Sequence, residues 1–349
     1  MKTALTDKLA ATGARIATYA GADTAAEFGD ASQELAALTR AAGVYDLGWR
    51  AKIKVAGDDR VRWLNGMVTN NVRDLKLDNG NYNFVLSPQG RIQGDLYVYN
   101  RGDHMLLDTE RSQFGNMLKL LEHYIIMDDV ELSDMTDKIT SLGVQGPNAA
   151  AVLKTLGIDP STTAPLVVTD HTWNGRAISV TRMANDDYLT YEIWLPSEIV
   201  PAVWDALTAA GARPVGTEAL EKFRVLAGVP KYGQDIRERD LPQETGQKHA
   251  LNFDKGCYVG QEIVERIHSR GNVHRTFTGF RLDAPAERGT KLLANDKELG
   301  ELTSVAQIGK RTLGLGYIRR EAGGPGAKVR AGGTEATITP LPFKEEVNG

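Results

Sequence analysis

Apolar residues that recur every three or four positions predict five helices in the first two thirds of the chain. A helix is expected over residues 30–42, where Asp30 can cap the first turn, Leu35 and Leu38 share one face, and Gly43 ends the pattern. The same spacing follows four further residues that commonly begin helices, which are Asp58, Ser112, Pro147 and Ser197. Each segment has one apolar stripe, so each is expected to pack one face against a core.

Short runs rich in β-branched and aromatic residues lie between the predicted helices and are bounded by Gly, Asn and Asp. These runs are predicted strands at residues 52–55, 83–86, 95–99, 105–107, 139–144, 177–181 and 191–195. Many of the loops between them are too short for the helical crossover that parallel pairing requires. The expected fold class is therefore α+β, with antiparallel sheets covered by helices on one face.

The pattern changes after about residue 275. Strand-like runs separated by turn residues follow without a helical stripe, at residues 277–282, 291–293, 302–307, 312–318 and 334–339. They predict a small C-terminal β-barrel. The expected organisation is an Ala-rich leader at 1–29, an α+β domain at 30–274 with a second lobe at about 140–215, the barrel at 275–345 and a tail at 346–349.

Composition and charge narrow the class of protein. Of 349 residues, 42% are hydrophobic and 25% are charged, which is typical of a soluble globular chain. A net charge of −4 disfavours a protein that binds nucleic acid by bulk phosphate neutralisation, and no sequence-specific nucleic-acid binding is expected. No apolar run approaches the length of a membrane span, and the N-terminal residues lack a signal-peptide core. We therefore expect a cytoplasmic protein without membrane contact.

The motifs of several large enzyme classes are absent from the sequence. It contains no G-x-x-x-x-G-K-[ST], H-E-x-x-H or G-x-S-x-G, which disfavours a P-loop NTPase, a zincin and an α/β-hydrolase. Even the nearest pair of histidines, His268 and His274, lacks a companion at metal-ligand spacing, so no metal site is expected. The single cysteine, Cys257, excludes an intrachain disulfide and a complete iron–sulfur site built from this chain alone. A reducing compartment is the simplest interpretation.

The densest unusual stretch surrounds Cys257. Gly256 and Gly260 bracket the thiol and indicate a backbone that turns sharply or lies close to another segment. A free thiol with a pKa of about 8.5 is only slightly ionised at neutral pH, and Lys255 and Arg266 are the nearest cations in sequence that could lower its pKa. The alternative is a small buried hydrophobe, but the glycines and cations favour an exposed, reactive cysteine.

The octapeptide KGCYVGQE at residues 255–262 resembles the signature of the YgfZ family, folate-binding proteins related to the aminomethyltransferase (T-protein) of the glycine cleavage system. Other segments resemble landmarks of this family in the same order, at residues 67–72, 90–96, 143–147, 191–193, 223–225 and 232–236. The resemblance covers roughly residues 40–320. It implies a multi-lobed, T-protein-like folate-binding domain followed by a C-terminal β-barrel, with tetrahydrofolate as the ligand.

A pterin needs a carboxylate that accepts its adjacent N–H donors, and apolar or aromatic walls for its flat ring. Alternation along residues 191–195 places Glu192 and Trp194 on one face of a strand, and Glu192 matches the family's pterin-binding glutamate. The alternative for Glu192 is a solvent-facing position. Asp95 corresponds to one of two acids that assist chemistry at folate N5 in the transferases, and Gly94 replaces the other. Asp95 either contacts the ligand or simply opens a strand.

Basic and aromatic residues at family positions complete the expected site. Arg182 and Arg224 suit the glutamate carboxylates of folate, and each could equally form a structural ion pair. Tyr82 lies where the family places an aromatic residue near the ligand, and the alternative is a core tyrosine. Residues 185–187 replace the Tyr-Thr-Gly run usual in the transferases, which weakens the case for aminomethyl transfer. The stretch from Lys255 to residue 275 has excess positive charge that suits folate glutamates, a partner or RNA, or that is simply solvated.

The resemblance implies that the protein binds tetrahydrofolate and supports assembly or repair of iron–sulfur clusters in other enzymes, and thereby tRNA modification. Cys257 would then be the working residue. One thiol can ligate one cluster iron or form a mixed disulfide, so iron–sulfur client or assembly proteins are expected partners. One alternative is a folate-dependent aminomethyltransferase or demethylase of the T-protein type, with Asp95 as its acid or base. Another is a folate-binding scaffold without chemistry.

Overall fold

The computed structural model describes residues 1–160, 163–184, 187–271 and 273–343. The chain forms two compact units, one made of Met1–Asn83 and Leu96–Leu220 and the other of Phe84–Asp95 and Glu221–Gly349. Among the described residues, no helix combines the length and the apolar character that a membrane span needs.

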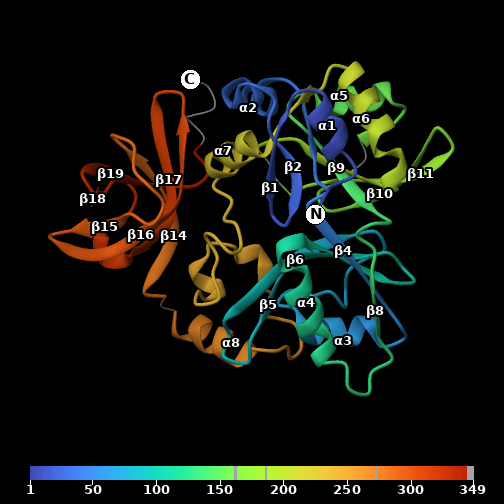
Figure 1. Ribbon diagram of the computed structural model, residues 1–349. Helices are drawn as coiled ribbons and strands as arrows, with labels where there is room; N and C mark the ends of the chain where they lie inside the picture. The colour runs from blue at the N-terminus through green and yellow to red at the C-terminus, as the bar shows by residue number, and fades with distance from the viewer. Residues whose placement is uncertain (161–162, 185–186, 272, 344–349) are drawn as a thin grey trace. The chain divides into compact units, whose positions relative to one another are not determined.

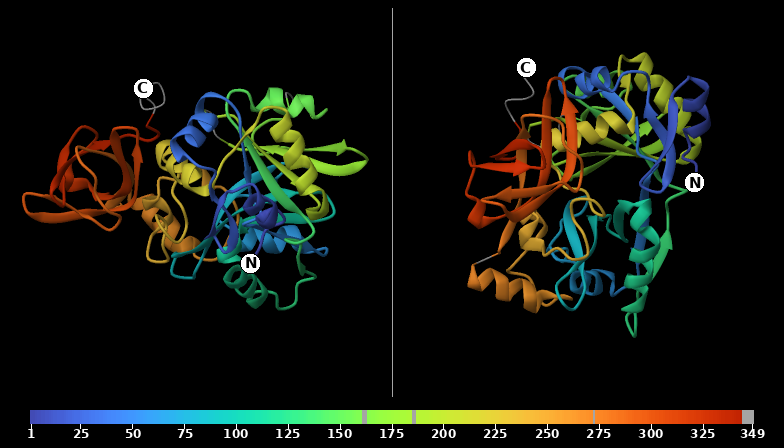
Figure 2. Two further views of the ribbon diagram at one scale, coloured as in Figure 1. Left: turned by 45° about the horizontal axis from the view of Figure 1, so that its top comes forward. Right: turned by 60° about the vertical axis from the view of Figure 1, so that its left-hand side comes forward.

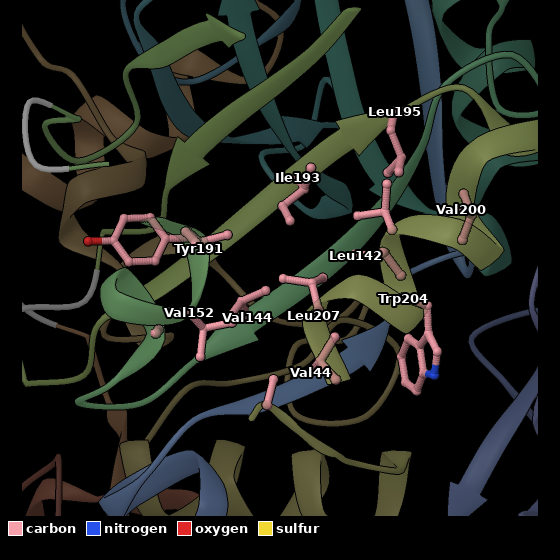
Figure 3. Packing of buried hydrophobic residues seen from close by; sticks show 14 of the residues in the cluster. Val44, Leu142, Val144, Val152, Tyr191, Ile193, Leu195, Val200, Trp204 and Leu207 are labelled. Carbon is pink, nitrogen blue, oxygen red and sulfur yellow. The ribbon is translucent and has the colours of Figure 1, made fainter. Parts of the chain in front are cut away.

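The first unit is built on a six-stranded sheet in the order β10-β11-β12-β9-β3-β13. Its β13–β3 pair is parallel and its other pairs are antiparallel. The strands are β3 (Gly43–Asp46), β9 (Thr140–Gln145), β10 (Val168–Trp173), β11 (Arg176–Arg182), β12 (Thr190–Leu195) and β13 (Arg213–Pro214). Apolar side chains of β3, β9 and β12 pack against those of α5 (Ala149–Thr155) and α6 (Val200–Ala209), as Figure 3 shows.

A second sheet has five strands in the order β5-β6-β7-β4-β8. They are β4 (Arg50–Ala56), β5 (Gly80–Leu86), β6 (Ile92–Asn100), β7 (Met105–Glu110) and β8 (Glu131–Asp134). The boundary between the units passes through β5 and β6, so the turn that joins these strands belongs to the second unit. The helices α3 (Arg60–Met67) and α4 (Arg111–His123) follow β4 and β7 in the chain (Figure 1).

The first 29 residues, expected from composition to be a leader, carry α1 (Thr6–Ala11), β1 (Arg15–Tyr19) and β2 (Ala22–Glu27). The side chains of Leu5 and Leu9 are fully buried in the core of the first unit. Alanine supplies little of the apolar contrast on which periodicity depends, so the sequence pattern does not reveal these elements. The predicted helix that follows is α2 (Ala31–Arg40), and Asp30 caps it by accepting a hydrogen bond from the Ser32 backbone N–H at 2.8 Å.

The second unit ends in a closed barrel with the strand order β14-β17-β16-β15-β18-β19 (Figure 2). Its strands are β14 (Arg275–Leu282), β15 (Lys291–Ala294), β16 (Lys297–Ile308), β17 (Arg311–Arg319), β18 (Lys328–Ala331) and β19 (Thr334–Thr339). Phe280, Leu302 and Ile318 belong to the apolar cluster that fills it. The predicted α+β fold with a C-terminal barrel is confirmed.

Besides α1, two helices among the described residues were not predicted from periodicity. They are α7 (Thr217–Ala227), in which the unit boundary falls, and α8 (Gln261–Arg270) in the second unit. The described residues also form short 3-10 turns, among them η2 (Ser197–Ile199), η3 (Pro242–Glu244), η4 (Lys248–Ala250) and η5 (Arg320–Ala322).

Candidate functional site

Glu192 lies in the middle of β12 with its side chain buried. The side chain is only 7% exposed, and every residue of this strand is buried. Tyr191, Ile193 and Leu195 belong to the apolar cluster of Figure 3, so Glu192 and Trp194 lie on the other face of the strand. The indole Nε1 of Trp194 donates a hydrogen bond to Glu192 Oε2 at 3.3 Å. The predicted alternation is confirmed, and its burial shows that Glu192 is not a solvent-facing residue.

Three further charged side chains form a buried ionic cluster in the first unit. Lys52 on β4 and Asp108 on β7 are directly opposite each other in the sheet, and their side chains are 0% and 1% exposed. The Lys52 ammonium donates to Asp108 Oδ2 at 2.6 Å, and Arg50 Nε donates to Oδ1 of the same carboxylate at 2.8 Å. Asp108 is therefore the shared counter-ion of two cations, and the three groups together carry one net positive charge.

Aromatic rings connect this cluster with Glu192. The Lys52 ammonium lies 5.0 Å from the centroid of the Trp194 ring, within cation–π distance. The Trp194 ring contacts the Tyr99 ring edge to face, with 4.7 Å between their centroids. The Tyr97 ring lies 6.4 Å from that of Tyr99, and the Tyr82 ring lies 5.1 Å from that of Tyr97. Tyr82, predicted to lie near a ligand, is thus part of an aromatic row that reaches the buried glutamate.

The pKa values of Glu192 and Asp108 are shifted in opposite directions. Burial, reinforced by the negative charge of Asp108, raises the pKa of Glu192 above its ordinary value of 4.5. Burial acts in the same direction on Asp108, but Arg50 and Lys52 outweigh it and lower the pKa of Asp108 below 3.8. Asp108 is therefore the permanent counter-ion, whereas the ionised form of Glu192 is not fully compensated by its surroundings.

Arg182 lies at the end of β11, directly opposite Tyr191 of β12. Its backbone carbonyl accepts a hydrogen bond from the Leu166 N–H at 2.8 Å. Its Nε is buried and has no hydrogen-bond partner among the described residues. Two of the three residues that replace the transferase Tyr-Thr-Gly run, Asn185 and Asp186, lie outside the described residues.

Arg224 in the second unit is held in a network that uses all of its donor groups. Its Nε and Nη2 bond Glu221 at 3.0 and 2.9 Å, its Nη1 bonds Asp235 at 2.6 Å and the Val229 carbonyl at 2.8 Å, and its Nη2 also bonds Ser304 at 2.9 Å. Asp235 is 0% exposed. The sequence left open whether Arg224 binds folate or forms a structural ion pair, and this geometry favours the structural ion pair.

Asp95 is half-buried on β6. It is the last residue of this strand that belongs to the second unit. Burial raises the pKa of Tyr232, and the negative charges of Glu238 and Asp95 add to this effect.

Cys257 is exposed, as predicted, in the loop that precedes α8. Gly260, the N-cap of α8, has φ of 83°, and a Cβ there would lie 2.6 Å from the Ser87 carbonyl oxygen, so the close approach inferred from this glycine is confirmed. Gly256 has no neighbour within 4 Å of such a Cβ. Lys255 is only 5% exposed, and its ammonium lies 4.9 Å from the centroid of the Tyr258 ring.

The basic stretch 255–275 is not one charged surface. Lys255 is buried, and Arg275 donates to Asp240 at 2.7 Å and to Glu244 at 2.9 Å. Two of its four cations are therefore buried or paired, whereas Arg266 on α8 is exposed.

Lys52, Asp108 and Arg50 were missed by the sequence reasoning. The available signal was an acid, Asp108, after the apolar start of β7, and cations at alternate positions of β4. It was not decisive, because Lys52 and Lys54 alternate on the same face of β4 and only Lys52 is buried.

Comparisons with known proteins agree with this architecture. Residues 5–255 match the family described as the GCVT N-terminal domain. The chain is 28% identical to an aminomethyltransferase of Rubrobacter xylanophilus over 98% of its own length and 94% of that protein. It is 27% identical to an aminomethyltransferase of Geobacillus kaustophilus, with 98% of each chain covered. The crystal structure of the glycine cleavage system aminomethyltransferase T from Bartonella henselae superposes with a TM-score of 0.90 at 20% identity, covering 99% of this chain and 98% of that one.

Proposed function

Because the chain belongs to the GCVT N-terminal domain family, we propose that it binds tetrahydrofolate in its first unit and that Glu192 accepts the N–H donors of the pterin. The observation that carries this proposal is a buried carboxylate beside an aromatic ring. Both oxygens of an ionised glutamate accept hydrogen bonds, so a pterin edge with two adjacent donors matches it in number and geometry.

The surroundings of Glu192 fit such a ligand. The raised pKa of Glu192 means that its ionised form lacks full compensation in the free protein. A ligand that brings two N–H donors supplies that compensation and favours the ionised form. Trp194 and Tyr82 are the aromatic candidates for the ring walls, and the buried, unpartnered Nε of Arg182 marks it as a candidate for a ligand carboxylate.

The proposal extends to a YgfZ-type role in assembly or repair of iron–sulfur clusters, in the cytoplasm, with an indirect effect on tRNA modification. Its support is the octapeptide around Cys257 and the exposure of that thiol. Cys257 would ligate a cluster iron or exchange disulfides with a partner. One thiol cannot hold a cluster alone, so an iron–sulfur client or assembly protein must supply the remaining ligands.

An aminomethyltransferase of the T-protein type fits about as well, and the named relatives favour it. In that case the family resemblance assigns Asp95 as the acid or base at folate N5. Gly94, at the position of a second acid, favours the YgfZ-type role instead.

Titration with tetrahydrofolate tests the binding proposal. Glu192→Gln replaces one acceptor oxygen with a donor, and the loss of charge-assisted hydrogen bonds should weaken binding about 10- to 100-fold. Glu198→Gln is the matched control, because Glu198 lies in the same unit with its side chain 61% exposed and should leave binding unchanged. Equal affinities of the wild type and the Glu192→Gln variant would show that the pterin does not bind at Glu192.

Two variants separate the two functions. Under the YgfZ-type role, Cys257→Ser abolishes support of cluster-containing enzymes in cells while tetrahydrofolate affinity is retained. Under the transferase role, the protein converts tetrahydrofolate and an aminomethylated lipoyl carrier into methylene-tetrahydrofolate, ammonia and the free dihydrolipoyl carrier, and Asp95→Asn abolishes this turnover. Unchanged cluster-enzyme activity with Cys257→Ser would reject the first role, and no turnover by the wild type would reject the second.

A further inference from the structure

A groove of about 990 Å³ lies on the outer surface of the barrel in the second unit. Cross-strand neighbours Lys291, Glu301 and Tyr317, on β15, β16 and β17, form one row in it. Leu302 and Ile318, the next residues on β16 and β17, point into the barrel, so this row faces outward. A volume of this size is at the upper end of the range for small-molecule sites.

Positive charge exceeds negative charge in this groove. Among the described residues that line it are six arginines and lysines but only four glutamates, whereas the whole chain has a net charge of −4. Because cations outnumber carboxylates, some carboxylates are shared between cations. Glu321 lies 3.0 Å from Lys297 and 3.8 Å from Arg319, and the second distance is too long for a hydrogen bond.

Glu301 is shared even more widely. It accepts hydrogen bonds at 3.0 Å from Arg239 and from Lys291, and it also contacts Arg237. Burial acts to raise the pKa of Glu301, but hydrogen bonds from Arg237 and Lys291 outweigh it and lower the pKa to about 2. This carboxylate is ionised at any working pH and is shared by three cations. Lys291 also pairs with Glu298 at 3.0 Å, and Arg237 with Asp240 at 3.4 Å.

The buried side of the groove contains an unsatisfied hydroxyl. Tyr317 is 1% exposed, and its hydroxyl has no hydrogen-bond partner among the described residues. The guanidinium carbon of Arg275 lies 4.7 Å from the centroid of its ring. Buried polar groups without a partner are uncommon in folded proteins and call for a partner, which a ligand could provide.

We propose that this groove binds a small molecule that carries at least two phosphate or carboxylate groups. Guanidinium groups bind both kinds of anion through paired hydrogen bonds. The side chains of Arg319 and Lys297 are 57% and 59% exposed, so they can turn toward a ligand without loss of packing. A ligand with two anionic groups would balance the two positive charges that the glutamates leave over.

Two other ligand classes fit the groove poorly. A flat heterocycle such as a pterin needs apolar or aromatic walls, and most residues that line this groove are charged. Single-stranded nucleic acid needs exposed rings on which bases stack, and Tyr317 is buried. The inference does not depend on folate binding at Glu192, so either can fail without the other.

Calorimetric titration of the full-length protein tests the proposal. The probes are inorganic tripolyphosphate and citrate, with acetate as a monoanion at matched ionic strength. We expect saturable binding of at least one polyanion, at least about tenfold tighter than acetate, and weakened by raising NaCl from about 50 to about 500 mM. The tighter of the two polyanions identifies the anionic group that the groove prefers.

Two barrel arginines provide matched variants. Arg319 lines the groove and Arg330 does not, and their side chains are equally exposed at 57%. Arg319→Ala should weaken polyanion binding about tenfold, whereas Arg330→Ala should leave it unchanged. The proposal is overturned if neither polyanion binds more tightly than acetate, or if the two variants weaken binding equally.

Discussion

Replacement of Asp108 by Asn tests the buried ionic cluster of the first unit. Asn keeps the shape of the side chain and removes its charge, so Lys52, which is 0% exposed, and Arg50 lose their shared counter-ion. Removal of one partner from a buried ion pair costs about 3–5 kcal/mol. At about 2–4 °C per kcal/mol for a unit of this size, the melting temperature should fall by about 6–20 °C.

The loss of stability caused by Asp108→Asn should depend on whether Glu192 is present. Asp108 helps to raise the pKa of Glu192, so without Asp108 the glutamate ionises more readily and replaces part of the lost charge near Lys52. In a Glu192→Gln background this replacement is impossible, and the Asp108→Asn substitution should cost more, by about 0.5–3 kcal/mol.

Urea and thermal unfolding of the four proteins in this cycle at pH 7 measure both quantities. Asp205→Asn is the control, because its side chain is 62% exposed and its ion pair with Lys8 should be worth less than about 1 kcal/mol. The folded-state pKa of Asp108 is lowered, so its contribution is present above about pH 3.8 and is lost as the pH falls through the folded value. A loss below about 1 kcal/mol, or equal losses in both backgrounds, would refute the reasoning.

Three further predictions concern stability. The raised pKa of Glu192 makes its ionised form unfavourable in the folded protein, so Glu192→Gln should stabilise the free protein at pH 7. Unfolding measured at several pH values should show that this gain disappears below about pH 4.5, where wild-type Glu192 is protonated. Gly260→Ala should destabilise the second unit by at least about 1–2 kcal/mol because φ is positive there, whereas Gly256→Ala should be nearly neutral; equal melting temperatures would contradict this. Arg224→Met leaves the buried carboxylate of Asp235 without its cation and should cost about 3–5 kcal/mol in urea unfolding, and a loss near zero would argue against a structural role.

Local sequence determined several parts of the fold. Strict alternation around Glu192 was enough to place it beside Trp194 on one face of a strand, because successive side chains of a strand point to opposite sides. The cap at Asp30 and the left-handed turn at Gly260 were likewise visible, since each depends on the backbone within a few residues. The segment that approaches Gly260, at Ser87, is distant in the chain and was not visible. The change of pattern after residue 275 identified the barrel for the same reason.

Tertiary structure decided which charges are buried and which are paired. Lys52 and Lys54 are equivalent in the sequence, and the pairing of β4 with β7 buries Lys52 against Asp108. Arg224 had two open interpretations, and its ion pair with the buried carboxylate of Asp235 favoured the structural one. Burial and Coulomb energy depend on distances between segments far apart in the chain, and these distances exist only after folding. The sequence by itself therefore determined the faces of the strands, and only the fold determined the electrostatic environment of Glu192.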